Sequence, residues 1–277
     1  MKIGIVGLGY WGKIILNNLR ELGYTDIVIC ETQPIDWASL GSKYKTIKDY
    51  KKMKCDKVFV LTPATTHYNI CEYFLKQGID VFCEKPLDQS ATKCQELYSL
   101  AQNNKATLFV DWVFTYNPAV HKIKSLIKEW GRPTSIIANR MNYGPVREDV
   151  NARWDLASHD VSIACFLLDQ EPEDVKWLDF KRDKSSVTDD STVGILSFKD
   201  TVVQINASWH HSVKNRLYTI EFKDRILYWD DSTGSIICAG ESYSEKGESP
   251  LHVSINSFIK GETNSNITLK VTKVLQK

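Results

Sequence analysis

The segment from Lys2 to Glu31 reads KIGIVGLGYWGKIILNNLRELGYTDIVICE. Its first apolar run, Ile3–Val6, suits one buried strand, and apolar residues then recur at helical spacing as far as Leu22. A second apolar run, Ile27–Cys30, leads directly to Glu31. We therefore predict a strand, a helix and a second parallel strand within about 30 residues, which is the length of a compact βαβ unit.

Three glycines separate the first predicted strand from the helix. Gly7 permits a sharp turn, Gly9 lets the backbone approach a pyrophosphate group, and Gly12 lets the helix lie close to the sheet. The free N–H groups at the helix start then face the two phosphates. Tyr10 and Trp11 lie between these glycines, and we assign them to the same dinucleotide-binding site. A tight turn without a ligand is the alternative, which the surrounding strand and helix pattern disfavours.

An acidic residue indicates which dinucleotide binds. Glu31 lies 22 residues after Gly9, at the end of the second predicted strand. A carboxylate there accepts hydrogen bonds from both ribose hydroxyls and repels a 2′-phosphate. The sequence therefore predicts NAD(H) as the cofactor in preference to NADP(H).

Two further strand ends carry candidate cofactor contacts. The buried-type strand Val58–Leu61 is followed by Thr62 and Pro63, and ligands of open α/β sheets lie at the carboxyl ends of their strands. We therefore expect Thr62 and Pro63 to face the cofactor. His67 lies near the start of the next predicted helix, where it either contacts the ligand or caps the helix.

The next strand, Asp80–Cys83, leads into Glu84, Lys85 and Pro86. The strand end places Glu84 and Lys85 beside the expected position of the nicotinamide. A lysine in a half-buried crevice can donate a hydrogen bond to a substrate oxygen and stabilise negative charge that develops there. Taken alone, a surface lysine in a turn is the simpler interpretation.

The character of the chain changes after a strand predicted at Thr107–Val113. Beyond a helix around Ala119–Trp130, strands dominate from Thr134 to Cys238, and their short turns favour antiparallel hairpins. One helix, Trp154–Leu168, interrupts them.

That interrupting helix carries Asp155 and His159 at i, i+4 spacing, on one helical face. A carboxylate so placed can hold an imidazole in one tautomer and stabilise its protonated form, which suits a general acid/base near neutral pH. An internal polar pair that satisfies itself is the alternative.

Composition excludes several classes of function. A formal net charge of +1 provides no overall field for nucleic acid or membrane. The seven cysteines are scattered without a C-x-x-C pair, which predicts reduced thiols and a cytoplasmic protein. No apolar run approaches the roughly 20 residues of a transmembrane helix. His210 and His211 are adjacent and point to opposite faces of a strand, so we predict no metal site.

Four features occur in one order along the chain: Gly7-x-Gly9-x-x-Gly12 with Glu31, Thr62-Pro63 with His67, Glu84-Lys85-Pro86, and Asp155-x-x-x-His159. This order resembles the Gfo/Idh/MocA family of nicotinamide-dependent oxidoreductases, which includes inositol 2-dehydrogenase, glucose-fructose oxidoreductase and nucleotide-sugar dehydrogenases. The resemblance implies an α/β fold with two domains. Residues 1–115 would form a Rossmann domain with a doubly wound parallel sheet. Residues 116–277 would form a C-terminal α/β domain for substrate binding and oligomerisation, with an open, mainly antiparallel sheet.

The resemblance also implies three catalytic roles. Lys85 would contact the reacting hydroxyl and the nicotinamide ribose, His159 would exchange the hydroxyl proton, and Asp155 would orient or assist it. The chain departs from the family where Asn151–Trp154 replaces a frequent glycine-rich run, so we expect a different pocket wall.

The expected reaction is hydride transfer between NAD(H) and a hydroxyl or keto carbon of a sugar. The segment Asn142–Val150 is similar to members found among surface-polysaccharide genes, which indicates a nucleotide-linked sugar or a polyol. Arg147 or Arg153 would bind a substrate phosphate or carboxylate, or else form a surface salt bridge. The alternatives are a biliverdin-reductase-like or imine reductase and a non-catalytic dinucleotide-sensing regulator. An exposed sheet face in the second domain would suit a homodimer or tetramer.

Overall fold

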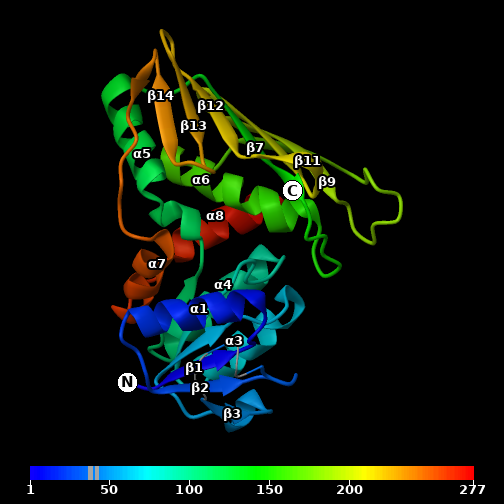
Figure 1. Ribbon diagram of the computed structural model, residues 1–277, viewed down its shortest axis with the longest axis vertical. Coiled ribbons are helices and arrows are strands. Elements are labelled where there is room, and N and C mark those ends of the chain that lie inside the picture. The colour runs from blue at the N-terminus through cyan, green and yellow to red at the C-terminus, as the bar shows by residue number, and fades with distance from the viewer. Residues whose placement is uncertain (37–39, 41–43) are drawn as a thin grey trace. The chain divides into compact units, whose positions relative to one another are not determined.

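The computed structural model describes residues 1–36, 40 and 44–277. It contains two compact units, coloured along the chain in Figure 1. Unit 1 comprises Met1–Asp111 and Leu251–Leu269, and unit 2 comprises Trp112–Pro250 and Lys270–Lys277. A single division at residue 115 therefore misses the return of residues 251–269 to the N-terminal unit, which no local sequence pattern signals.

The sheet of unit 1 is the predicted Rossmann sheet. In the described part of the chain it has six parallel strands in the order β3-β2-β1-β4-β5-β6. Their bounds are β1 Ile3–Val6, β2 Ile27–Cys30, β3 Lys45–Ile47, β4 Lys57–Val60, β5 Asp80–Cys83 and β6 Leu108–Val110. The strand order reverses between β1 and β4, which is where ligands of doubly wound sheets bind.

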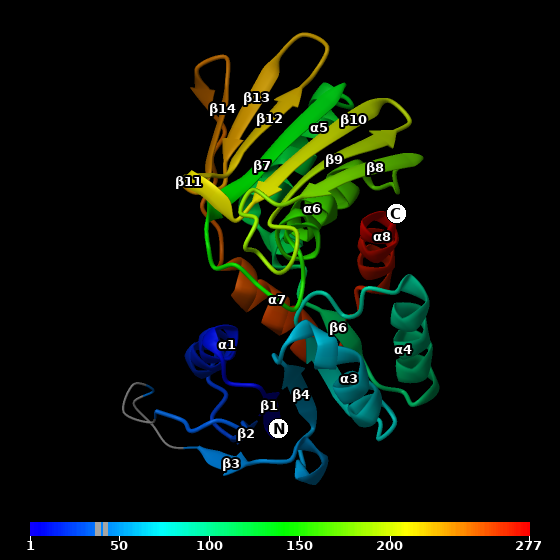
Figure 2. The same cartoon turned by 90° about the vertical axis from the view of Figure 1, so that its right-hand side faces the viewer.

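Helices cover both faces of this sheet. Figure 2 shows α1 (Tyr10–Glu21) on one side and α3 (His67–Leu75) and α4 (Ala91–Asn103) on the other. The expected strand at Thr107–Val113 is shorter than predicted, because a 3₁₀ turn at Val113–Tyr116 follows β6 closely.

A row of aromatic rings explains why residues 251–269 belong to unit 1. Phe59, Phe82 and Phe109 are register neighbours on β4, β5 and β6, so their side chains share one face. Phe258 on α7 (Pro250–Ile259) lies 5.3 Å from Phe59 and 5.6 Å from Phe82, between ring centroids. All four rings are fully buried. Aromatic residues of this size dominate core energetics, so α7 completes the core of the N-terminal unit.

The sheet of unit 2 is mixed and mostly antiparallel. Its order is β15-β14-β13-β12-β7-β10-β9-β8 within the described residues, with β11 paired to β7. The strands are β7 Ser135–Tyr143, β8 Asp174–Phe180, β9 Ser191–Phe198, β10 Thr201–Ser208, β11 His210–Asn215, β12 Leu217–Glu221, β13 Ile226–Asp230, β14 Ser235–Cys238 and β15 Glu241–Ser242. The pairing of β7 with β10 is parallel, which hairpins alone do not produce.

Helices pack on one face of this sheet. Figures 1 and 2 show α5 (Pro118–Trp130) and α6 (Ser158–Leu168) on the same side of the strands. The predicted helix at 154–168 is present, but its first turn, Arg153–Ala157, is a π-helix. Single π turns within helices are frequent at functional sites. A further helix, α8, spans Ser265–Gln276.

Candidate functional site

The glycine turn after β1 forms an open cradle. A Cβ on Gly7 would lie 2.8 Å from the Leu61 carbonyl oxygen, and Gly7 has a φ of +92°. A Cβ on Gly12 would lie 2.4 Å from the Gly7 carbonyl oxygen, whereas nothing lies within 4 Å of one on Gly9. The helix that starts here has no side-chain cap at Gly9, and Tyr10 is 83% exposed. These residues fit the pyrophosphate of the expected dinucleotide, because no side chain caps the start of the helix and the space beside Gly9 is open.

Glu31 is held at the edge of this cradle. Its carboxylate accepts hydrogen bonds from the backbone N–H of Leu8 at 2.7 Å and of Gln33 at 2.8 Å. Burial opposes ionisation of Glu31, but these hydrogen bonds outweigh it and lower its pKa. A carboxylate has about four acceptor positions, so Glu31 retains capacity for ribose hydroxyls.

The turn after β4 lies against the glycine turn. The Thr62 methyl group is 3.0 Å from the position of a Cβ on Gly7, so the ends of β1 and β4 meet there as predicted for a switch-point site. The Thr62 hydroxyl shares a hydrogen bond of 2.7 Å with that of Thr66. Pro63 precedes the short 3₁₀ turn Ala64–Thr66.

His67 connects two turns of the site. It is buried, with its Nε2 2.7 Å from the Thr62 carbonyl oxygen and its Nδ1 2.8 Å from that of Pro86. Each ring nitrogen thus lies within hydrogen-bond distance of a carbonyl oxygen, which can only accept a hydrogen bond. The two roles expected for His67 were ligand contact and helix capping, and these contacts add a third, which is to tie the turn after β4 to the turn after β5.

Lys85 lies in the second of these turns. The side chain is half-buried, and its backbone N–H donates to Glu84 Oε2 at 3.0 Å. The next peptide bond, to Pro86, is cis. Because His67 holds the Pro86 carbonyl, the backbone on the C-terminal side of Lys85 is fixed at the carboxyl end of β5.

In unit 2 the π turn carries Asp155, and both of its carboxylate oxygens are held. Trp209 Nε1 donates to Oδ2 at 3.1 Å, and Arg147 lies 3.3 Å from Oδ1. Arg147 also binds Asp149 with two hydrogen bonds, and Arg153 pairs with Asp179 at 2.7 Å. These contacts favour the salt-bridge interpretation of both arginines over substrate binding.

His159 lies one residue beyond the start of α6 and is half-buried. Its ring contacts the ring of Phe114 edge to face, with 4.9 Å between centroids. The guanidinium of Arg140 lies 4.3 Å from the centroid of Phe114. Phe114 is thus in contact with both side chains, a placement that local spacing does not predict.

A buried ionic cluster anchors the same helical turn. Arg140 Nε donates to Asp160 at 2.8 Å, and the Tyr218 hydroxyl also donates to Asp160. All three side chains are fully buried. Removing one partner of a buried pair leaves an uncompensated charge, so the cluster fixes α6 against β7 and β12.

Sequence reasoning missed Trp209 and Phe114, since both reach their partners across long sequence separations. Trp209 follows β10 directly, and the parallel pairing that places it there was not expected. Sequence reasoning also missed Asp111, although an acidic residue directly after a buried strand of a Rossmann sheet is a usable signal.

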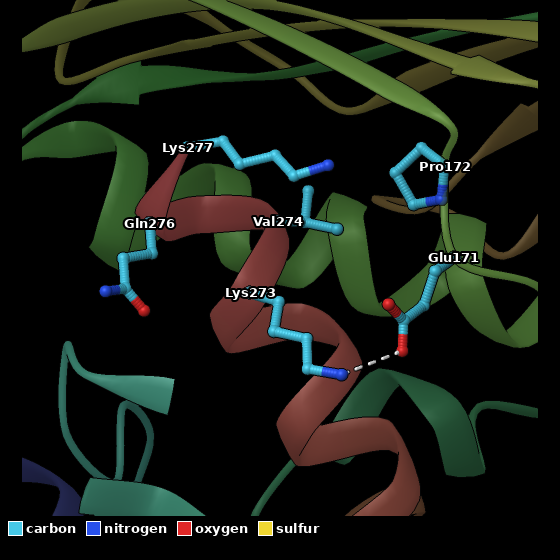
Figure 3. A pocket seen from close by; sticks show the side chains of 6 residues that line it. All are labelled: Glu171, Pro172, Lys273, Val274, Gln276 and Lys277. Carbon is cyan, nitrogen blue, oxygen red and sulfur yellow. Dashed lines mark hydrogen bonds and ion pairs between the residues drawn. The ribbon is translucent and has the colours of Figure 1, made fainter. Parts of the chain in front are cut away.

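The residues that the structure describes also bear on metal sites, membrane spans and pockets. No group of three or more His, Cys, Asp or Glu side chains is arranged there to hold a metal ion. None of the described helices is long and apolar enough to cross a membrane. A pocket of about 340 Å³ lies in unit 2, and the distance between Lys273 and Glu171 beside it is 3.5 Å. Figure 3 shows the side chains that line it. It is lined by none of the residues selected from the sequence.

Comparisons with known proteins identify the family to which both domains are similar. The model of the NAD-binding Rossmann domain of the GFO/IDH/MocA oxidoreductases matches residues 1–112, and the model of the C-terminal domain of that family matches residues 120–224. The inositol 2-dehydrogenase of Rhizobium meliloti is 26% identical over 190 residues, which cover 63% of this chain and 57% of that protein. The UDP-N-acetylglucosamine 3-dehydrogenase of Acidithiobacillus ferrooxidans is 23% identical over 180 residues, or 64% and 57% of the two chains. Each match thus spans less than two thirds of the relative.

Solved structures share the fold over nearly the whole chain. The crystal structure of the same Acidithiobacillus ferrooxidans enzyme superposes with a TM-score of 0.86 over 99% of this chain and 95% of that one, at 18% identity. The myo-inositol 2-dehydrogenase of Lactobacillus plantarum gives a TM-score of 0.80 over 99% and 95%, at 15% identity.

Proposed function

The chain belongs to the Gfo/Idh/MocA family of NAD-binding oxidoreductases, and we propose that it transfers a hydride between NAD(H) and a hydroxyl or keto carbon of a sugar. The observation that carries the proposal is the cradle at the ends of β1, β2 and β4, where the start of α1, which has no side-chain cap, lies beside an ionised Glu31. The two relatives described above are dehydrogenases named for inositol and for a UDP-linked amino sugar. Their names favour a polyol or a nucleotide-linked sugar as the substrate.

The proposed chemistry divides between the cofactor and three side chains. Bound NAD⁺ supplies the hydride acceptor for the carbinol carbon. Lys85 donates a hydrogen bond to the substrate oxygen and stabilises the negative charge that develops on it. His159 takes the hydroxyl proton during oxidation and returns it during reduction. Asp155 orients the site from the π turn, where Trp209 and Arg147 fix its carboxylate.

Thermal shift measurements test this function directly. The protein would be heated with NAD(H) or NADP(H), and then with the preferred cofactor and a panel of nucleotide sugars and free polyols. If the cofactor raises the melting temperature and one class of sugar raises it further, the result supports the proposal and selects the substrate for a hydride-transfer assay. If the dinucleotide raises the melting temperature but no sugar changes it further, the result would favour a dinucleotide-sensing regulator.

The preference for NAD(H) depends on Glu31. We expect Glu31→Ala to weaken NADH binding by roughly 10- to 100-fold, because hydrogen bonds to a charged group contribute about 1.5–3 kcal/mol. NADPH binding should weaken less or improve, since the repulsion of a 2′-phosphate is lost. Isothermal titration of both cofactors measures the ratio. Gln33→Ala is the control, because Gln33 contacts Glu31 through its backbone N–H. An unchanged ratio of affinities would remove Glu31 from the proposed site.

We also propose that the protein is a homo-oligomer assembled through the larger sheet. One cross-strand row, which we call the sheet-face row, lies on the face opposite α5 and α6. In register order it is Ile195, Gln204, Ile137, Thr219, Tyr228 and Ile237. Ile195, Tyr228 and Ile237 are 37%, 44% and 43% exposed. An uncharged row across six strands suits a second copy of the same face.

Charge on the sheet-face row should prevent this assembly. We expect the double variant Ile195→Lys, Tyr228→Lys to be monomeric, since like charges would then face each other across the interface. Light scattering would measure its molar mass at concentrations where the wild type has the mass of an oligomer. Val213→Lys on β11 is the control, because Val213 is 64% exposed and lies outside the row. A monomeric wild type would contradict the proposal.

We place the protein in the cytoplasm. The seven cysteines form no disulfide, and all except Cys55 are buried. Unpaired thiols are typical of reducing compartments.

A further inference from the structure

Asp111 occupies a special position in unit 1. It directly follows β6, and its backbone N–H donates to the Cys83 carbonyl of β5 at 2.9 Å. It therefore lies beside the point where the chain leaves β5 for Glu84 and Lys85. The side chain is only 1% exposed.

The carboxylate of Asp111 is anchored on one side only. Ser254 on α7, itself fully buried, donates a hydrogen bond of 2.6 Å to Oδ1. Oδ2 is also buried and has no hydrogen-bond partner among the described residues. Burial of a carboxylate is unfavourable unless opposite charge or hydrogen bonds compensate it, so a cation is expected near Oδ2.

Lys85 is the charged side chain that acts on this carboxylate. Burial raises the pKa of Asp111 to about 6, while the Ser254 hydrogen bond and the positive charge of Lys85 oppose the rise. The parallel register of β5 and β6 pairs Cys83 with Val110, so Lys85 and Asp111 leave the same edge of the sheet.

We propose that Asp111 is a positioning residue, whose carboxylate, anchored by Ser254, holds the Lys85 ammonium in place by charge attraction. This inference rests on the proposed function only for its catalytic consequence, namely that the fixed ammonium can donate to the substrate oxygen. The ionic coupling itself requires no substrate. Ser254 belongs to the returning segment, so α7 takes part in the site as well as in the core.

The first experiment measures the coupling in the protein without ligands. The Asp111 carboxyl would be followed by NMR in protein labelled with ¹³C-aspartate and assigned with Asp111→Asn. We expect a pKa of about 6 in the wild type and a measurably higher pKa in Lys85→Met, since the positive charge of Lys85 lowers the pKa of this carboxyl. Lys93→Met, an exposed lysine of the same unit, should leave it unchanged. If the pKa of Asp111 were the same in Lys85→Met as in the wild type, the inference would be overturned.

The second experiment measures the consequence for turnover. Asp111→Asn keeps the shape and an acceptor for Ser254 but removes the charge, so we expect kcat to fall roughly 10- to 100-fold while KM for the cofactor stays constant. Asp111→Glu, which restores the charge, should recover part of kcat. If kcat fell in Asp111→Asn and Asp111→Glu only in proportion to the loss of folded protein, Asp111 would have a merely structural role. That result would count against the inference.

The two experiments separate this inference from the proposed function. A Lys85-dependent titration in a protein that oxidises no sugar would support the coupling and contradict the function. An active enzyme in which Asp111 titrates independently of Lys85 would support the function and contradict the coupling.

Discussion

Replacing Lys85 with methionine should lower kcat by roughly 10²- to 10³-fold, because that is the usual effect of removing one donor that stabilises developing negative charge. Methionine keeps the length of the side chain and its apolar stem but removes the charge and the three N–H donors. The affinity for NADH should change much less, since the cradle at Gly7–Gly12 and Glu31 lies on other strand ends. Steady-state kinetics and NADH titration together measure the two effects.

A nearby lysine provides the matched control. Lys93 lies in α4 of the same unit, is 53% exposed and pairs weakly with Asp88 at 3.5 Å. Lys93→Met should leave both kcat and NADH affinity unchanged. If Lys85→Met lowered NADH affinity as strongly as kcat, Lys85 would be a cofactor-binding residue without the proposed role on the substrate oxygen.

Replacing His159 with asparagine should lower kcat by about 10²- to 10⁴-fold, the usual contribution of one general acid/base. Asparagine is polar and similar in size, but it neither accepts nor returns a proton near neutral pH. KM for the sugar should change little if the effect lies in proton transfer. The part of the pH dependence of kcat that is due to ionisation of the His159 imidazole should also be absent in this variant.

His121 offers a control with a similar ring contact, although it is exposed where His159 is half-buried. Its ring contacts Phe166 edge to face at 5.1 Å, much as His159 contacts Phe114 at 4.9 Å, and its Nε2 lies 2.8 Å from the Thr115 carbonyl oxygen. His121→Asn should retain full turnover. Full activity in His159→Asn would instead favour a reductase of an imine or another unsaturated substrate, which needs no base for a hydroxyl proton.

Much of the fold could be predicted from the sequence because its signals are local. Short apolar runs give the strands of the Rossmann sheet, and the glycine spacing between Val6 and Leu16 places the first helix. In unit 2, β7 alternates half-buried and buried residues from Ser135 to Met141, and such alternation made the positions of the strands predictable. The structure confirms the expected α/β class and the mainly antiparallel second sheet, to which it adds the parallel pair of β7 and β10.

The remaining features depend on contacts between distant residues. The parallel pairing of β7 with β10 is set by the crossover between them, which includes α6 and two other strands, and no short turn signals it. Trp209 reaches Asp155 only because of that pairing. The π turn at Arg153–Ala157 alters the helical spacing on which the i, i+4 argument for Asp155 and His159 relied.

The ring of Phe258 has a consequence for how the protein is made. A ribosome releases β1 to β6 early, yet the aromatic row on β4, β5 and β6 lacks the ring of Phe258 until α7 emerges, after the whole sheet of unit 2. The N-terminal unit therefore cannot complete its core in the order of synthesis, although N-terminal domains generally fold first. Its last core contacts, those of Phe258 with Phe59 and Phe82, form only after almost the whole chain has been made.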